Sequence, residues 1–186
     1  MAEFSPSRQA LIDHLKANAV LTNGPFTLRS GVVSSWYIDA RRTTFSGEGS
    51  LLAGTAVAEL LPAEATAVGG MTMGADPIAV ATAIAASMTG RQVSAFSIRK
   101  EIKDHGTGGR VVGPIAERDR VVVLEDTTTT GSALIEAIGV LRAEGVAVIG
   151  AIALVDRSDG AAAAALERLD IPYLALATRA DLGVEA

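Results

Sequence analysis

The chain has 186 residues, 49% of them hydrophobic and 20% charged, and this composition predicts one globular domain rather than a disordered chain. Its net charge of -5 argues against a nucleic-acid partner, since duplex binding depends on a basic face, and the absence of cysteine excludes a disulfide framework and a cysteine-ligated metal. Because neither a signal-peptide pattern nor a run of about twenty apolar residues occurs, we expect a cytoplasmic protein with no membrane contact.

The part of the chain up to about residue 39 is predicted to form a small hood outside the main sheet. A helix is expected from Ser5 onward, because a capping serine followed by proline is a typical helix start. Two short strands should follow at 26–28 and 36–39, joined through Ser30 and Gly31.

From residue 50 onward, short apolar runs alternate with helical patterns. Because the runs show no polar alternation, they predict a parallel sheet that helices cover on both faces. The fold class is therefore α/β with a doubly wound parallel sheet, and residues 1–186 form one domain. The expected strands are 65–68, 93–98, 121–124, 146–155 and 173–176, and the expected helices are 50–61, 76–88, 132–143 and 160–169.

Polar or glycine pairs follow four of these strands, each at the carboxyl end. In a doubly wound sheet, ligands bind in the crevice beyond those ends. We therefore expect the four pairs to meet at one binding site. They are Gly69-Gly70, Arg99-Lys100, Glu125-Asp126 and Asp156-Arg157.

The segment 125–132, Glu-Asp-Thr-Thr-Thr-Thr-Gly-Ser, carries the strongest functional signal. It leaves an apolar strand and enters a helix, so backbone N–H groups and hydroxyls gather at a helix N-terminus, which favours phosphate binding. It lacks the Gly-Lys pair of a Walker A loop. The adjacent acids Glu125 and Asp126 fit a ligand that also offers ribose hydroxyls, with Mg²⁺ nearby. The alternative is a threonine helix cap beside two solvated acids.

This segment resembles the phosphoribosyl-diphosphate signature of the type I phosphoribosyltransferases, in which a hydrophobic strand precedes two acids, Thr-Thr-Gly and a small residue. The resemblance implies that Glu125 and Asp126 lie near the ribose hydroxyls, with Asp126 in a catalytic role. It also implies that the following residues cradle the 5-phosphate. The phosphoribosyl-diphosphate residues it assigns there are Thr127, Thr128, Thr129, Thr130, Gly131, Ser132 and Ala133.

Three other segments resemble the orotate phosphoribosyltransferase branch of that family. Residues 26–39 are similar to its N-terminal hood, 99–106 to its mobile catalytic loop, and Asp156-Arg157 to the motif that holds the orotate carboxylate. The resemblance implies transfer of phosphoribosyl to orotate, giving orotidine 5′-monophosphate and diphosphate, in de novo pyrimidine synthesis. The residues it assigns to orotate are Arg29, Trp36, Tyr37, Thr129 and Arg157. On its own, Arg157 is better explained as a salt-bridge partner of Asp156.

The segment 99–110 is expected to close over the reacting groups. Diphosphate leaves as a multiply charged anion, which a cationic loop neutralises, and glycines let such a loop open for exchange and shut against water. The alternative is a solvated, charged connection. We expect Mg²⁺ as cofactor, carried by the diphosphate substrate rather than by a protein cage. The cations assigned to the leaving diphosphate are Arg99, Lys100, Lys103 and His105, the last three as catalytic residues.

Two positions depart from the family pattern. Met73-Gly74 stands where many members carry an aromatic residue and a lysine that contacts the diphosphate, so that contact is not expected here. Arg29 stands where a lysine is common, which keeps the charge but changes the donor geometry.

Two rival hypotheses stay open. One is a phosphoribosyltransferase for adenine, xanthine or uracil, although a neutral base has no use for Arg157. The other is a nucleotide-sensing regulator of the same fold that binds RNA, which needs a basic surface. The resemblance also implies a homodimer in which the segment 99–110 of one subunit closes over the active site of the other.

Overall fold

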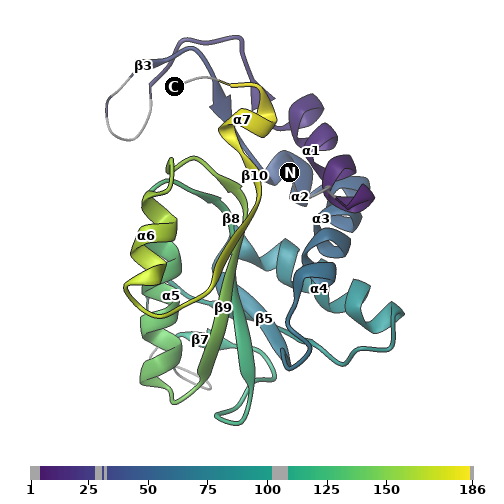
Figure 1. The fold of residues 1–186 in the computed structure, drawn as a ribbon, viewed down its shortest axis with the longest axis vertical. Coiled ribbons are helices and arrows are strands. Elements are labelled where there is room, and N and C mark those ends of the chain that lie inside the picture. Colours follow the sequence, from purple (N-terminus) through teal and green to yellow (C-terminus); the bar gives the residue numbers. More distant parts are fainter. Residues whose placement is uncertain (1–4, 28–30, 32, 102–108, 185–186) are drawn as a thin grey trace.

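The chain is described by a computed structural model that covers residues 5–27, 31, 33–101 and 109–184. Its centre is a six-stranded sheet with the order β10-β9-β8-β5-β6-β7 (Figure 1). The pairs from β10 to β6 are parallel, and only β7 at the edge runs antiparallel to its neighbour. The predicted α/β class with a doubly wound sheet is confirmed. The strands are β5 (Ala67–Met71), β6 (Ser94–Ile98), β7 (Val111–Val112), β8 (Arg120–Thr128), β9 (Ala147–Asp156) and β10 (Tyr173–Thr178).

Helices cover both faces of the sheet, as Figure 1 shows. One layer packs α1 (Pro6–Asn18), α3 (Gly47–Leu60) and α4 (Ala75–Met88) against the sheet. The other layer contains α5 (Ser132–Ala143) and α6 (Ala161–Glu167). The chain ends in a short helix, α7 (Arg179–Leu182).

The central strand β8 explains why its apolar run shows no polar alternation. Successive side chains of a strand point to opposite faces. Val122 and Leu124 belong to the core under α1, α3 and α4, whereas Val121 and Val123 belong to the core under α5. None of the four is more than 1% exposed. A strand covered on both faces therefore needs an apolar residue at every position.

The hood consists of two small antiparallel pairs rather than the single pair that was expected. β1 (Val20–Leu21) pairs with β4 (Tyr37–Ile38), and β2 (Phe26–Thr27) pairs with β3 (Val33–Ser34). The predicted strands 26–28 and 36–39 thus exist in part but do not pair with each other. A four-residue helix, α2 (Arg41–Thr44), connects the hood to α3.

The strand β5 corrects the prediction that Gly69 and Gly70 form a loop after a strand. Both lie inside β5 and are buried. A Cβ on Gly69 would lie 2.1 Å from the carbonyl oxygen of Phe96, and one on Gly70 would lie 2.1 Å from that of Leu124. The two glycines are needed because neighbouring backbones approach this strand closely.

The strand β8 is longer than predicted at its carboxyl end. Its pairing with β9 continues through Glu125↔Ala153 and Thr127↔Val155 to Thr128↔Asp156. The two acids and the first threonines are therefore held on a strand and not on a loose loop, which fixes their positions. None of the described helices is long and apolar enough to cross a membrane.

Candidate active site

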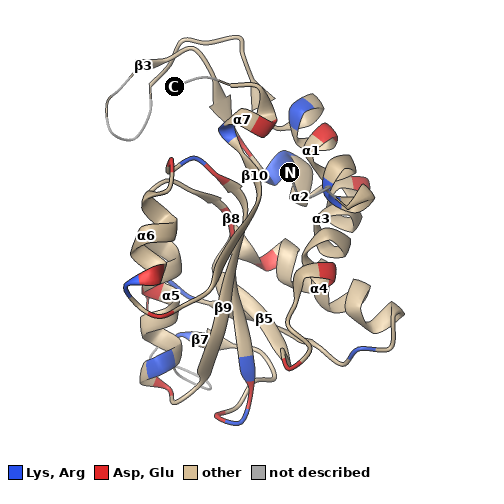
Figure 2. Cartoon of the chain, in the orientation of Figure 1, with Lys and Arg blue, Asp and Glu red and all other residues tan. Residues whose placement is uncertain are grey.

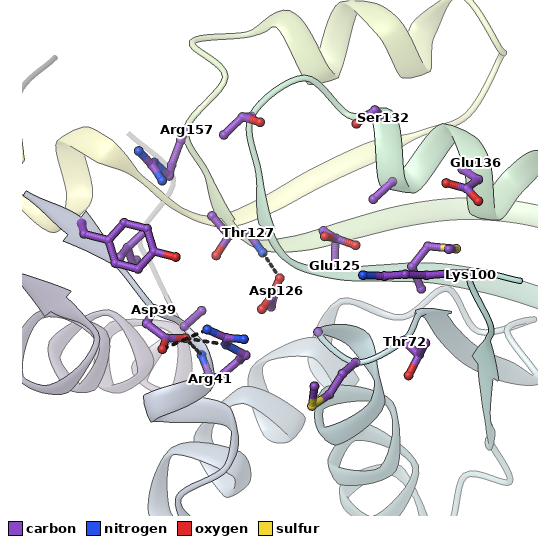
Figure 3. A pocket seen from close by; sticks show the side chains of 18 of the residues that line it. Asp39, Arg41, Thr72, Lys100, Glu125, Asp126, Thr127, Ser132, Glu136 and Arg157 are labelled. Carbon is purple, nitrogen blue, oxygen red and sulfur yellow. Dashed lines mark hydrogen bonds and ion pairs between the residues drawn. The ribbon is translucent and has the colours of Figure 1, made fainter. Parts of the chain in front are cut away.

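A cavity of about 830 Å³ opens where the carboxyl ends of the parallel strands meet the hood. Figure 3 shows its wall, which combines residues 37–41 of the hood and α2, the turn 72–74 after β5, Lys100, the β8–α5 segment and Arg157. Three of the four pairs that were expected to meet at one edge contribute to it; the exception is Gly69-Gly70, which lies within β5.

The turn between β8 and α5 brings a helix N-terminus to the cavity. Gly131, the residue before α5, adopts φ 78°, a left-handed conformation that glycine adopts without strain. Its N–H donates to Thr128 Oγ1 at 3.0 Å, and the Ser132 N–H donates to Thr130 Oγ1 at 3.3 Å. These side chains shape the turn. The segment's residues that line the cavity are Glu125, Asp126, Thr127, Thr129, Ser132 and Ala133, so Thr128, Thr130 and Gly131 support the wall without lining it.

The two acids of β8 lie in the cavity wall and are mostly withdrawn from water. Burial raises the pKa of Glu125 to about 8, the negative charge of Asp126 adds to this rise, and Lys100 opposes it. Burial also raises the pKa of Asp126, against the N–H of Thr127, which donates to its Oδ1 at 2.7 Å. Among the described residues, the charge of Lys100 thus offsets only part of the effect that burial and Asp126 have on Glu125.

Arg157 follows β9 and is held from two sides. Its N–H donates to the carbonyl oxygen of Thr128 at 2.9 Å, and its guanidinium carbon lies 4.5 Å from the ring centroid of Trp36. Within the described residues its buried Nε has no hydrogen-bond partner. Asp156 is not its salt-bridge partner, because that carboxylate accepts from the Tyr173 hydroxyl at 3.0 Å and the Ser158 N–H at 2.6 Å.

The two neighbouring aromatic residues of the hood, both assigned to orotate from the sequence, differ in their relation to the cavity. Trp36 is 7% exposed and packs beneath Arg157 without lining the cavity, whereas Tyr37 is half-buried and lines it. Trp36 therefore acts on the site by supporting Arg157. Tyr37 in turn packs against Phe26, with ring centroids 5.9 Å apart.

The cations predicted to neutralise diphosphate are only partly described. Lys100 lines the cavity, next to Glu125 in Figure 3. Arg99 directly follows β6, and its N–H donates to the carbonyl oxygen of Arg110 at 2.9 Å, which ties together the two ends of the segment. The predicted residues Arg29, Lys103 and His105 lie outside the described residues.

Sequence reasoning missed Asp39 and Arg41 as cavity residues. Arg41 Nε lies 2.7 Å from Asp39 Oδ1, and Nη2 lies 3.2 Å from Oδ2, so the pair is bidentate. Their spacing at i and i+2, at the end of a predicted strand, was the available signal. It was weak, because α2 is too short to leave a helical pattern.

The described residues contain no group of three or more His, Cys, Asp or Glu that could hold a metal ion. The carboxylates of Glu125 and Asp126 nevertheless have the oxygen chemistry that Mg²⁺ prefers.

A doubly wound sheet with two acids, a threonine-rich turn and a helix N-terminus at its carboxyl edge defines a type I phosphoribosyltransferase. No protein-family model matches the chain. The orotate phosphoribosyltransferase of Streptomyces avermitilis is 40% identical over 179 residues, which cover 96% of this chain and 98% of that relative. The chain belongs to the orotate phosphoribosyltransferase family, whose members are transferase enzymes.

Solved structures agree with this assignment. Orotate phosphoribosyltransferase of Mycobacterium tuberculosis H37Rv in complex with Fe(III) dicitrate matches with a TM-score of 0.86 at 36% identity, covering 96% of this chain and 100% of that one. A structure of the same enzyme in complex with 5-phospho-α-D-ribosyl 1-diphosphate matches with a TM-score of 0.81 at 34% identity, with the same coverage.

Proposed function

We propose that the chain transfers the phosphoribosyl group of 5-phospho-α-D-ribosyl 1-diphosphate to orotate, forming orotidine 5′-monophosphate and diphosphate in pyrimidine synthesis. The observation that carries this proposal is that one cavity combines the β8–α5 segment with the half-buried cation Arg157. The first suits a ribose phosphate and the second suits an anionic base. The relative of known structure that holds 5-phospho-α-D-ribosyl 1-diphosphate supports the first half.

The β8–α5 segment binds the sugar phosphate in this proposal. The 5-phosphate accepts hydrogen bonds from backbone N–H groups at the N-terminus of α5 and from the hydroxyls of Thr129 and Ser132. The ribose hydroxyls donate to Glu125 and Asp126, so two largely buried acids gain hydrogen-bond donors from the ligand. Asp126 thereby holds the sugar while positive charge develops at its anomeric carbon.

Arg157 recognises the carboxylate of orotate. Its stacking on Trp36 fixes the guanidinium plane, and its buried Nε offers an N–H donor that has no acceptor among the described residues. Tyr37 lines the same cavity and provides a flat surface for a planar base. Adenine and uracil have no carboxylate, so they would leave the buried Nε of Arg157 without an acceptor among the described residues.

Lys100 stabilises the departing diphosphate, as its position beside Glu125 in the cavity supports. Lys103 and His105 are proposed to join it when the segment 99–110 closes. Mg²⁺ is the proposed cofactor; the substrate would carry it, Glu125 and Asp126 would help to hold it, and its charge would offset negative charge on the diphosphate. Closure also excludes water, which would otherwise react with the electron-poor anomeric carbon.

The proposed working form is a homodimer that shares its active sites, and the surface of α4 supports it. That helix carries a single charged residue, Asp76, in its first turn (Figure 2). Val80, Ile84 and Met88 recur along it at four-residue spacing and are 53%, 58% and 78% exposed. A second copy of the chain would cover this apolar stripe. We propose that the dimer works in the cytoplasm, in keeping with its cysteine-free sequence.

Complementation between two variants tests the shared site, at an orotate concentration low enough that each variant alone is inactive. Lys103→Ala and Arg157→Ala are unfolded, mixed and refolded. Random pairing makes about half of the dimers mixed. If the two residues of one site come from different subunits, each mixed dimer has one intact site and one site with both defects. Roughly a quarter of wild-type activity should then return. A mixture that stays inactive, although mixed dimers form, would mean that the segment serves its own subunit.

Substrate choice tests the proposed reaction itself. With 5-phospho-α-D-ribosyl 1-diphosphate and Mg²⁺ present, orotate should be consumed, and uracil and adenine should be poor substrates. Equal turnover of uracil and orotate would remove the role of Arg157.

The RNA-binding alternative receives no support from the net charge of -5.

A further inference from the structure

Arg41 is a cavity residue to which the proposed reaction gives no role. It is the first residue of α2, and Asp39 orients its guanidinium through the contacts at 2.7 and 3.2 Å. The backbone N–H of Arg41 also donates to Asp39 Oδ1 at 3.2 Å. A guanidinium has five N–H donors, and Asp39 uses two of them. The remaining donors serve a ligand without breaking the pair that fixes the side chain.

Asp126 lies between Arg41 and the turn that follows β5. Figure 3 shows Arg41 next to Asp39 and near Asp126. From the turn, Gly74 approaches Asp126 so closely that a Cβ on Gly74 would lie 2.7 Å from its Oδ1. The turn residues that line the cavity are Thr72, Met73 and Gly74, which carry no charge. This part of the wall therefore receives its positive charge from α2 and not from the turn.

Acidic residues outnumber cations among the described residues that line the cavity. Among the described residues that line it, five are acids and only three are cations, namely Arg41, Lys100 and Arg157. The three cations are spread apart: Arg157 stacks on Trp36, Lys100 lies beside Glu125, and Arg41 lies beside Asp126 (Figure 3). A multiply charged substrate needs a cation near each anionic group, because the acids would otherwise repel it.

The position of the 5-phosphate indicates which anionic group reaches Arg41. In the proposed function that phosphate lies at the N-terminus of α5. Residues 127–131 connect this helix end to Asp126. The anomeric carbon lies at the opposite end of the ribose from the 5-phosphate. With the ribose hydroxyls on Glu125 and Asp126, the anomeric diphosphate extends away from α5 and past Asp126, toward Arg41.

We infer that Arg41 binds the anomeric diphosphate of 5-phospho-α-D-ribosyl 1-diphosphate, held in position for this by Asp39. The inference rests on the proposed function, since it assigns one more contact to the same substrate. A guanidinium suits this role because its planar fork binds two phosphate oxygens at once. Arg41 thus supplies from α2 a charge that the Thr72–Gly74 turn does not provide.

Binding of the two halves of the substrate tests the inference without turnover. Titration calorimetry would measure Mg-diphosphate and ribose 5-phosphate separately on wild type, Arg41→Ala and Arg42→Ala. Arg42 is the matched control, since it is an exposed arginine of the same helix that does not line the cavity. Arg41→Ala should weaken Mg-diphosphate on the order of tenfold or more, the usual loss for a hydrogen bond to a charged group, and leave ribose 5-phosphate within about twofold. Arg42→Ala should change neither.

Each other outcome overturns a particular step. If Arg41→Ala and Arg42→Ala weaken the binding of Mg-diphosphate equally, Arg41 contributes only to the overall electrostatic potential of the site and makes no specific contact. If Arg41→Ala weakens ribose 5-phosphate instead, Arg41 acts on the ribose through Asp126 and not on the diphosphate. Wild type that binds ribose 5-phosphate but not Mg-diphosphate would refute the inference alone. Wild type that binds neither half would refute the proposed function from which the inference starts.

Discussion

Protonation of Glu125 should couple substrate binding to pH. Burial, together with the negative charge of Asp126, raises the pKa of its carboxyl to about 8 when no ligand is bound. At pH 7 the group is therefore about nine-tenths protonated. Ribose hydroxyls that donate to Glu125, and Mg²⁺ near it, stabilise the carboxylate and lower the pKa. If the pKa returns to the usual range of a glutamate, binding at pH 7 releases about 0.9 proton from this residue.

Titration calorimetry measures this release. 5-Phospho-α-D-ribosyl 1-diphosphate with Mg²⁺ is titrated at pH 7 in two buffers of different ionisation enthalpy, and the difference in heat gives the number of protons. The Glu125→Gln variant subtracts protons that come from the substrate's own phosphates. Because the empty site holds the proton and the complex does not, affinity should rise nearly tenfold from about pH 6 to pH 7 and level off above about pH 8.

Equal proton release by wild type and Glu125→Gln would refute this reasoning. In that case either Glu125 is already ionised in the empty protein, or it keeps its proton in the complex. In either case, binding of the ribose hydroxyls would not be coupled to ionisation of Glu125.

Three further substitutions probe separate parts of the molecule. Asp126→Asn should leave the melting temperature nearly unchanged and lower turnover by about tenfold to a hundredfold, because an amide replaces a charged acceptor; near-wild-type turnover would remove its assigned role. Arg157→Ala should raise the KM for orotate far more than the KM for 5-phospho-α-D-ribosyl 1-diphosphate in initial-rate kinetics, and the reverse order would place Arg157 outside the base subsite. Leu154→Ala, at a β9 side chain that is 1% exposed, should lower the free energy of unfolding by about 2 to 5 kcal/mol in urea titration, and a loss below about 1 kcal/mol would show that the core repacks.

The sheet and the β8–α5 segment could be predicted because their signals are local. The run of valines in β8 reflects burial on both faces, and the two acids and four threonines after it indicate the approach to a helix start, although β8 itself continues to Thr128. The start of α5 at Ser132 was therefore placed correctly.

The errors came from contacts between distant parts of the chain. Gly69 and Gly70 look like a turn in the sequence, but they are in a strand because the backbones at Phe96 and Leu124 lie against them. The hood strands are two residues long, so pairing and not pattern defines them. The contact of Arg157 with Trp36 joins residues far apart in the sequence and leaves no local signal.

The site shows the same division. The acids and threonines of the β8–α5 segment were identified as one motif, whereas Arg41 was overlooked because a charged residue in a short helix is usually a solvated one. Only its position beside Asp126, together with the approach of Gly74 to the same carboxylate, makes it a candidate ligand of the substrate.

The loss of orotate absorbance on mixing with the purified chain tests the central claim most directly. The rate is measured with both 5-phospho-α-D-ribosyl 1-diphosphate and Mg²⁺ present, and again with each omitted in turn. The proposed function predicts loss of orotate only in the complete mixture, with orotidine 5′-monophosphate and diphosphate formed in equal amounts. No loss of orotate in the complete mixture, from a chain that is folded and binds ribose 5-phosphate, would contradict it.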